Sequence, residues 1–185
     1  QKVLFNKSMN RNILDKSVQA SVQRAIDNDQ LFSLKHISQL KELIRLNITV
    51  IIDPNTSQNY SCMTLIQYSI KQNKPDALEY LLNVADESGM QLKDILRSNF
   101  KYENNNLLFL AVDFNSNSCL KTLIAFRKRK DKNFSVDISD PFGESPLTRA
   151  IKLGNEEAIS ILLSNGADLF YFDGTKNKLS KKRIT

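Results

Sequence analysis

The chain has 185 residues, a formal net charge of +6 and a hydrophobic fraction of 41%. This length and composition suit a folded domain with a core of its own. The longest aliphatic run, residues 48–52, is far shorter than the roughly 20 residues that a membrane span needs, and no charged start leads into an apolar signal core. Cys62 and Cys119 lack metal-site spacing and are too few for a disulfide framework, so we expect reduced thiols and a cytoplasmic location.

The N-terminal part, residues 1–39, predicts helices. We expect a long first helix, followed by a degenerate unit that caps one end of the structure. Residues 40–58 are an insertion, in which residues 48–52 could form a strand but are interpreted as a segment packed beneath a loop. Cys62 falls in a predicted loop. The first helix is predicted because apolar residues recur at helical spacing, at Ile13, Leu14, Val18, Val22, Ala25 and Ile26.

One module occurs three times in the rest of the chain. The anchor residues 147–150 of the last copy have equivalents 39 residues upstream, at 108–111, and 81 residues upstream, at 66–69. Every apolar slot stays apolar, and Gly154 of the last copy is replaced by Asn in the other two. The replacement is physically reasonable, because Asn adopts the left-handed backbone conformation next best after Gly.

The last copy resembles an ankyrin repeat. Residues 140–150 read DPFGESPLTRA, and residues 162–168 read LLSNGAD, similar to the family's turn, T-P-L-H-x-A and L-L-x-x-G-A-D over a period of 33. Ser145 and Thr148 replace the family's Thr and His, and both hydroxyls can still bond the backbone at the helix start. The resemblance implies an all-α solenoid of about four stacked helix pairs with irregular loop insertions.

The earlier copies depart from the family pattern, because they lack the turn Gly and the Pro and are spaced by 42 and 39 residues. We expect the extra residues in loops or lengthened second helices, at 83–99 and 126–139. The predicted organisation is N-terminal helices and a capping repeat at 1–39, an insertion at 40–58, repeats at 59–99, 101–139 and 140–173, and a basic polar cap or tail at 174–185.

Residues that could carry chemistry are few. His36 is the single histidine, which excludes motifs built on two His, and the five glycines form no phosphate-binding loop. Cys119 occupies a slot that holds Ala in the other copies, so we interpret it as a small buried packing residue. Glu156 and Glu157 fall in a first helical turn, where negative charge complements the helix dipole. We therefore expect no catalytic residue, no metal site, no cofactor and no enzymatic activity in this segment.

The resemblance also implies a partner-binding surface, because ankyrin units present a turn and the exposed side of the first helix on one shared concave face. Aromatic and apolar residues at positions that the fold does not need to bury are candidate hot spots. The alternative is that the inserted loops cover this face and bury the aromatics. The predicted partner-binding residues are Tyr60, Met63, Lys71, Gln72, Tyr102, Glu103, Asn105, Asp113, Phe114, Phe142, Glu144, Lys152 and Leu153.

We expect a monomer that binds a partner protein through this face. The composition, rich in Asn, Lys and Ile, and the degenerate repeats resemble ankyrin-containing effectors that intracellular bacteria deliver into host cells, which predicts a host protein as partner and the host cytosol as location. AT-rich protists and large DNA viruses share such a composition.

Two alternative functions stay open. The segment could recruit substrates for a larger enzyme with a catalytic domain elsewhere. The basic run at 127–132 and the basic tail at 176–183 could instead bind nucleic acid or anionic lipid. Nucleic acid is disfavoured, because no aromatic residues interleave with these clusters as a stacking platform requires.

Overall fold

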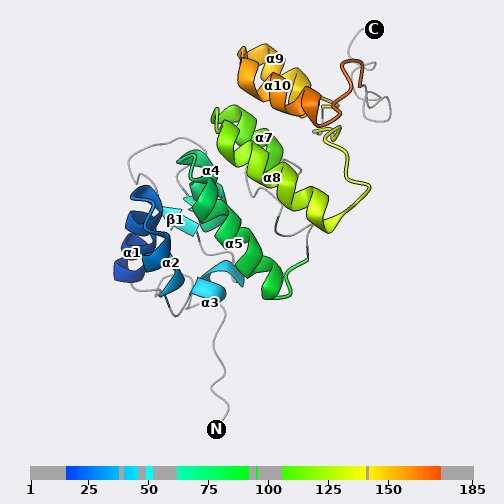
Figure 1. Cartoon of the computed structure of the whole chain (residues 1–185). Coiled ribbons are helices and arrows are strands. Elements are labelled where there is room, and N and C mark those ends of the chain that lie inside the picture. The colour runs from blue at the N-terminus through cyan, green and yellow to red at the C-terminus, as the bar shows by residue number, and fades with distance from the viewer. Residues whose placement is uncertain are drawn as a thin grey trace, which may run out of the picture.

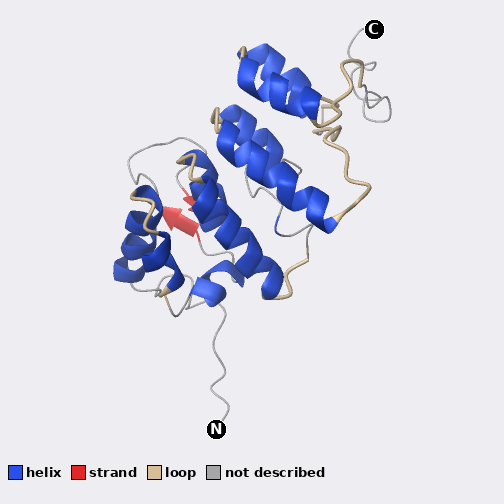
Figure 2. Ribbon diagram, in the orientation of Figure 1, coloured by secondary structure: helices blue, strands red, loops and turns tan. Residues whose placement is uncertain are grey.

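The computed structural model describes residues 16–37, 40–45, 49–51, 62–91, 95, 106–140 and 142–171. Helices dominate this part of the chain (Figure 2). The N-terminal elements are α1 (Lys16–Asp27), α2 (Leu31–Lys35) and α3 (Leu40–Arg45). As predicted, α1 turns an apolar side inward, with Val22 and Ile26 fully buried.

Three helix pairs follow and stack side by side (Figure 1). The first helices α4, α7 and α9 pack on one another in that order, and the second helices α5, α8 and α10 do the same, while α2 and α3 contact α5. With α1 and α2 as a fourth pair, the predicted all-α solenoid is confirmed. The pairs are α4 (Leu65–Lys71) with α5 (Pro75–Glu87), α7 (Leu107–Asp113) with α8 (Asn117–Lys130), and α9 (Pro146–Leu153) with α10 (Glu156–Ser164).

A left-handed residue separates the two helices of every pair. Asn73, Asn115 and Gly154 have φ values of 50°, 55° and 66°, and Asp29 between α1 and α2 has a φ of 53°. The amide of the next residue donates to a carbonyl five residues earlier in each case, as from Ser116 N to Ala111 O at 2.8 Å. These bonds satisfy carbonyls that the helix end would leave unpaired. The predicted exchange of Gly for Asn in this slot is confirmed.

The first helices also begin alike. Ser145 Oγ accepts from Thr148 N at 3.1 Å, and Asn106 Oδ1 accepts from Leu108 N at 3.2 Å. Thr64 forms a capping box with Gln67, in which each side chain accepts a bond from the other residue's backbone amide. These three N-caps stand in equivalent positions of the three copies, so the same local chemistry starts each first helix.

The residues inserted between copies lie partly in lengthened second helices, as expected. α5 has 13 residues and α8 has 14, whereas α10 has 9. The interpretation of residues 48–52 as a packed loop segment was wrong. Thr49–Ile51 forms strand β1, which pairs antiparallel with β2 (Cys62–Thr64). β-branched residues favour an extended backbone, and β2 leads directly into α4, so the ladder fastens this segment to the first full repeat. Cys62, predicted in a loop, is therefore on a strand.

The core runs along the stack between the two layers of helices. The anchor slots Ile66, Leu108 and Leu147 are all buried. Cys119 is also fully buried, in the slot that holds Ala77 and Ala158, which confirms its role as a packing residue. Desolvation raises the pKa of its thiol to about 12, against a smaller opposing effect of a backbone hydrogen bond, so the thiolate needed for reactivity is scarce at neutral pH.

Candidate functional site

The predicted partner-binding residues divide into three groups in the structure. Four of them, Tyr60, Tyr102, Glu103 and Asn105, lie outside the described residues. Met63 is fully buried in β2, so the prediction that it faces a partner was wrong. Its position corresponds to a turn residue in the last copy, but here the chain forms a strand whose side chains alternate between core and surface. The remaining eight lie on α4, α7 and α9, directly after α4 or α7, or on the turn before α9.

Pairs of these residues stand at the ends of the three first helices. Lys71 ends α4 and Gln72 follows it exposed. Phe114, which follows α7, is half-buried and packs against the core, so it has a structural role whether or not it touches a partner. Leu153, at the end of α9, is 54% exposed. The C-terminal ends of the first helices therefore share one edge of the stack, with Leu153 as the more exposed apolar residue among these pairs.

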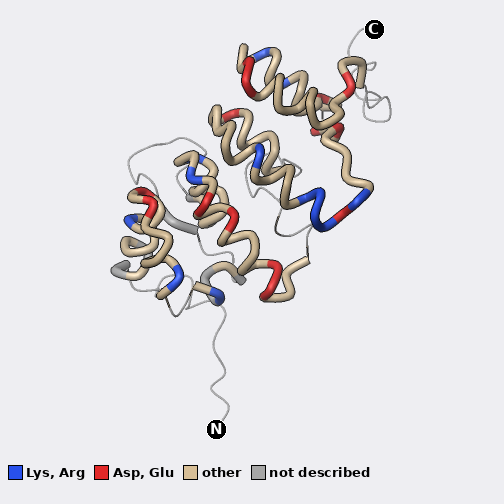
Figure 3. The backbone as a smooth tube through the Cα atoms, in the orientation of Figure 1, with Lys and Arg blue, Asp and Glu red and all other residues tan. Residues whose placement is uncertain are grey.

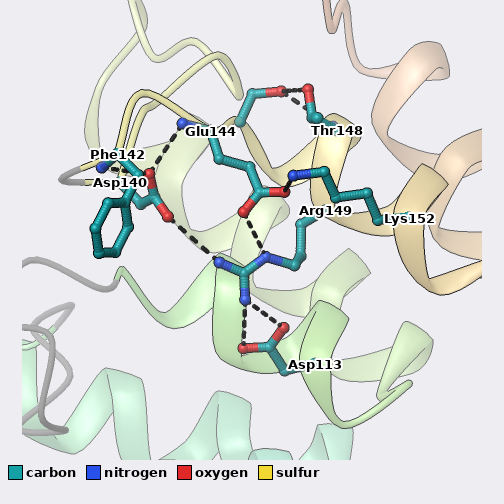
Figure 4. A network of polar contacts seen from close by, with 8 residues as sticks. Asp113, Asp140, Phe142, Glu144, Thr148, Arg149 and Lys152 are labelled. Atoms are coloured by element: carbon teal, nitrogen blue, oxygen red, sulfur yellow. Dashed lines mark hydrogen bonds and ion pairs between the residues drawn. The ribbon is translucent and has the colours of Figure 1, made fainter. Parts of the chain in front are cut away.

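The turn before α9 holds Phe142 at the surface. Asp140 is 1% exposed, and its Oδ1 atom accepts hydrogen bonds from Phe142 N at 2.8 Å and Glu144 N at 2.9 Å (Figure 4). Gly143 closes the turn with a φ of 82°, where a residue with a side chain would be strained. The side chain of Phe142 is 70% exposed at the tip. A large aromatic side chain is thus mostly exposed on a turn whose backbone is held in place by the buried Asp140.

Arg149 lies at the centre of a polar network behind this turn (Figure 4). Its Nε donates to Glu144 Oε2 at 2.9 Å, and its Nη2 donates to Asp140 Oδ2 at 3.3 Å. Nη1 donates to both carboxylate oxygens of Asp113, at 3.1 and 3.4 Å. The other oxygen of Glu144 lies 2.8 Å from Lys152 Nζ. Arg149 therefore ties the turn to α9 and ties both to the end of α7.

The network shifts the pKa values of Asp113, Glu144 and Arg149. Desolvation raises the pKa of Asp113, and the carboxylates of Glu144 and Asp140 add to this, so the favourable contacts with Arg149 do not fully compensate. Desolvation acts in the same direction on Glu144, but hydrogen bonds and charges from Lys152 and Arg149 outweigh it and lower the pKa of that carboxyl. Burial disfavours the charged form of Arg149, yet its carboxylate partners leave its pKa raised. The guanidinium is thus firmly charged.

A related contact occurs at the other end of the stack. Tyr68 Oη in α4 donates to Asp27 Oδ1 at the end of α1, at 2.7 Å. Tyr68 and Arg149 occupy the same slot of their repeats, and each reaches an Asp at the end of the preceding first helix. Desolvation, together with this hydrogen bond, raises the pKa of Tyr68 to about 12. The slot therefore serves in both places as a polar connection between neighbouring pairs.

The second helices carry their own connections. Asn117 and Asn155 exchange amide hydrogen bonds at 3.2 and 3.0 Å, and Asn117 also donates to Glu157 at 3.1 Å. Glu157 lies in the first turn of α10, as predicted, and it also forms an ion pair with Lys121 at 3.0 Å. The hydrogen bonds from Lys121 and Asn117 lower the pKa of Glu157.

The basic run on α8 contacts residues of both neighbouring pairs. Arg129 forms an ion pair with Glu79 of α5 at 3.1 Å, and Lys130 pairs with Asp86 of the same helix. Lys128 Nζ donates to Asn165 after α10 at 2.8 Å. Figure 3 shows these basic residues at the C-terminal end of α8. Much of this charge is thus engaged between repeats, which weakens the alternative that the run is a surface for phosphates. The basic tail at 176–183 lies outside the described residues.

The described acidic side chains serve ion pairs and do not form a metal site. Among the described residues, His, Cys, Asp and Glu form no group of three or more that could hold a metal ion. The carboxylates of Asp113, Asp140 and Glu144 converge on a guanidinium instead. None of the helices in the described part of the chain has the length and apolar character to cross a bilayer.

Sequence reasoning missed the residues that organise this site. Arg149 falls at the variable position of the family motif, and Asp140 marks only the start of the repeat, so neither was predicted to have a role. The sequence does contain a signal for this network. Asp140 begins the turn and Arg149 follows nine residues later, so two opposite charges lie close to the same helix start.

The comparisons with known proteins agree with this architecture. A family model described as ankyrin repeats in three copies matches residues 91–173. A search of curated proteins found no match. Ankyrin repeats are in general modules for protein–protein interaction and are typically non-catalytic. Residues 91–173 are thus similar to ankyrin repeats. The left-handed turn, the N-cap and the packing of a helix pair also occur before residue 91, in α4 and α5.

Proposed function

We propose that the chain binds a partner protein through its first-helix face. This face comprises the turn before α9 and the C-terminal ends of α4, α7 and α9. The observation that carries the proposal is Phe142, 70% exposed at the tip of a turn that Asp140 fixes from within. The described residues of the face are Lys71, Gln72, Asp113, Phe114, Phe142, Glu144, Lys152 and Leu153.

The physical basis is pre-organisation. Exposed aromatic residues cost free energy in water and yield it on burial, at roughly 25 cal/mol per Å² of apolar surface. A flexible loop would lose much of this gain in ordering, but the turn that carries Phe142 is already ordered by two backbone bonds to one carboxylate. Leu153, 54% exposed, adds a second apolar contact on the same repeat. The two residues, one in the turn before α9 and one at the end of α9, are therefore candidate hot-spot residues of the last repeat.

The charges around these two residues favour selective recognition of a partner and not general electrostatic attraction. Glu144, Arg149 and Lys152 are paired with one another or with neighbouring acids. A partner must carry groups that are compatible with this fixed pattern, because like charges placed against one another are costly at an interface. The first-helix face thus combines an apolar contact with a polar surround.

The same face could serve a module that recruits substrates to a larger enzyme, in which case the bound protein would be the substrate. Delivery into a host cell, with a host protein as partner, remains a prediction from composition. Neither possibility changes which surface is expected to make contact.

Site-specific photo-crosslinking tests the proposal. A photoreactive amino acid replaces Phe142 in one variant, Leu153 in a second and Ala125 in a third; Ala125 is exposed on α8, away from the first helices. We expect the positions 142 and 153 to capture the same protein from native lysate, and the position 125 not to capture it. Capture from position 125 with none from the other two would show that the binding surface lies on the second helices, and the proposal would be rejected.

Phe142→Ala supplies an independent test once the captured protein is purified. We expect weaker binding without a change in thermal unfolding, since the side chain is largely exposed. Phe32→Ala is the matched control, because Phe32 is also a largely exposed phenylalanine but lies on α2 at the other end of the stack.

A further inference from the structure

Arg127 differs from the three basic residues that follow it on α8. Lys128, Arg129 and Lys130 each bond a residue of a neighbouring pair. The guanidinium of Arg127 forms no ion pair with a described residue, and its buried Nε atom has no hydrogen-bond partner. Desolvation lowers the pKa of Arg127, against a smaller opposing effect of the Asp131 charge. A partly buried cation is therefore held without the acceptor that its charge favours.

The chain after α8 brings an aromatic ring and a hydroxyl close to this cation. Arg127 Cζ lies 4.4 Å from the centroid of the Phe134 ring, a cation–π contact that limits the movement of the guanidinium. Phe134 N donates to Asp131 O at 3.1 Å, so the chain turns directly after the helix. Ser135 follows Phe134 and is exposed, and its Oγ accepts from Asp137 N at 3.0 Å. An exposed hydroxyl on an ordered turn thus lies one residue beyond the ring that contacts Arg127.

We propose that Ser135 is a phosphorylation site and that Arg127 receives its phosphate. A protein kinase transfers the γ-phosphoryl group of ATP to Ser135 Oγ. The bond from this group to ADP breaks, the new O–P bond forms, and the hydroxyl proton passes to the catalytic base of the kinase. The product adds negative charge and several strong acceptor oxygens. A guanidinium binds such a group through its planar set of donors, so the modification supplies the acceptor that Arg127 lacks.

The residues that precede Ser135 suit a kinase that selects basic substrates. Lys132 stands three residues before the hydroxyl and is exposed, and residues 127–130 are all basic. Charge patterns of this kind distinguish the substrates of one kinase from those of another. Lys132 forms no ion pair with a residue in the described ranges, so its charge is available for recognition.

A phosphate attached to the chain has an advantage over a dissolved anion at this position. Asp131 and Asp137 lie within four residues of Ser135 and repel anions that approach from solution. Asp137 accepts from Asp168 N with both carboxylate oxygens, which directs its charge toward the end of α10. A phosphate on Ser135 is held near Arg127 by the short connecting chain, at an effective concentration that dissolved phosphate does not reach. We therefore expect Arg127 to bind the attached phosphate and not inorganic phosphate.

Phosphoserine incorporated at position 135 of the full chain tests the contact. Thermal unfolding is compared with and without the phosphate, in the wild type and in Arg127→Gln. We expect the phosphate to raise the unfolding midpoint by about 2–4 °C in the wild type and to lose this effect in Arg127→Gln. A titration followed by ³¹P NMR should also show that the phosphate loses its second proton at a lower pH in the wild type than in Arg127→Gln, because a nearby cation favours the doubly charged form.

Ser160 provides the matched control for position 135. It is an exposed serine on α10, and the residues one turn before it, Glu156 and Glu157, are acidic. Phosphoserine at position 160 should have the same effect on unfolding in the wild type and in Arg127→Gln. Arg127→Lys keeps the charge but not the planar donors, so it should retain part of the effect at position 135.

A kinase reaction tests whether Ser135 is accessible in the folded protein. The unmodified full chain is incubated with ATP and a purified serine kinase that prefers basic substrates, and mass spectrometry locates the phosphate. We expect Ser135 to be modified at least about fivefold faster than Ser160, since only Ser135 follows basic residues.

Three outcomes would overturn the proposal. The first is an equal effect of the phosphate at position 135 in the wild type and in Arg127→Gln. The second is a folded chain that stays unmodified at Ser135 while the same kinase modifies a peptide of residues 127–139. The third is binding of inorganic phosphate to the unmodified chain that is lost in Arg127→Gln, which would assign Arg127 to a dissolved anion. None of these measurements depends on partner crosslinking at positions 142 and 153.

Discussion

Arg149 on α9 donates to both carboxylate oxygens of Asp113 at the end of α7, and this contact joins the last repeat to the one before it. The same guanidinium bonds Asp140 and Glu144 of the turn that carries Phe142. One side chain thus couples the stacking of repeats to the shape of the candidate binding surface. A substitution of Arg149 is therefore expected to affect both the stability of the fold and partner binding. The effect on binding is expected through the turn that carries Phe142, because Arg149 itself is only partly exposed.

Arg149→Ala should destabilise the fold by about 2–4 kcal/mol, because it leaves three largely buried carboxylates without their shared cation. Arg149→Lys should recover only part of this, since an ammonium cannot donate to three carboxylates from one planar fork. Chemical denaturation monitored by circular dichroism measures the change. The exposed pair of Lys121 and Glu157 offers a control, for which Lys121→Ala should cost much less than Arg149→Ala, because water screens the pair. Similar losses for both variants would contradict the central role of Arg149.

The left-handed backbone conformation at position 154 predicts the order of stability among variants of Gly154. Gly154→Ala should destabilise by about 1–2 kcal/mol, because a side chain is strained at a φ of 66°. No heavy atom lies within 4 Å of the added Cβ position, so the cost is conformational and not steric. Gly154→Asn should cost less, since Asn occupies this slot in the two preceding repeats. Thermal unfolding of the three proteins tests the order, and an Asn variant less stable than the Ala variant would refute it.

Acid should weaken the turn through Glu144. Its folded pKa lies below the ordinary value of 4.5, because the hydrogen bonds and charges of Lys152 and Arg149 outweigh desolvation. The unfolded chain then binds a proton before the folded chain does, so this contribution is present above pH 4.5 and is lost as pH falls through the folded pKa. Denaturant unfolding between pH 6 and pH 3 should show a smaller acid-induced loss in Glu144→Gln than in the wild type. Identical pH profiles would mean that the carboxylate does not contribute.

Asp113 should act in the opposite direction. Desolvation raises its folded pKa, so the folded state holds its proton more tightly and the stability that this supplies is lost as pH rises through the folded pKa. We expect Asp113→Asn to be less destabilising at neutral pH than Arg149→Ala, because it removes a costly charge together with its bond. Unfolding of both variants at pH 7 gives the comparison, and a larger loss for Asp113→Asn would show that its pairing with Arg149 dominates.

The basic run should contribute little stability and little phosphate binding. Arg129→Ala and Lys130→Ala each remove an ion pair whose partners are at least a third exposed, so each should cost less than about 1 kcal/mol and lose its effect at high salt. In the wild-type protein, Glu79 and Asp86 pair with the basic run. This protein should therefore bind DNA or anionic vesicles no more tightly than a control basic protein of equal net charge. Tight binding with a steep salt dependence would instead favour a phosphate-binding surface.

Much of the repeat architecture could be predicted from the sequence alone. The spacing of the apolar slots, the Gly-to-Asn exchange at Asn73 and Asn115, and the hydroxyl at Ser145 all reflect requirements of the local backbone. Such requirements involve residues within one or two helical turns, and they recur in every copy, so comparing the copies reveals them. The fold class, the break between the two helices of each copy and the burial of Cys119 follow from these rules.

The candidate site depended on contacts that no local pattern contains. Met63 was misplaced because the pairing of β2 with β1 joins residues from two irregular segments. The bond from Arg149 to Asp113 spans 36 residues, and the ion pair from Arg129 to Glu79 spans 50 residues. Whether a charged side chain is free for a partner or engaged by a neighbouring repeat is decided only when the helix pairs stack. The sequence therefore determined the repeating unit, and the tertiary structure decided which of its side chains remain at the surface, because burial and ion pairing are properties of residues brought together across the stack.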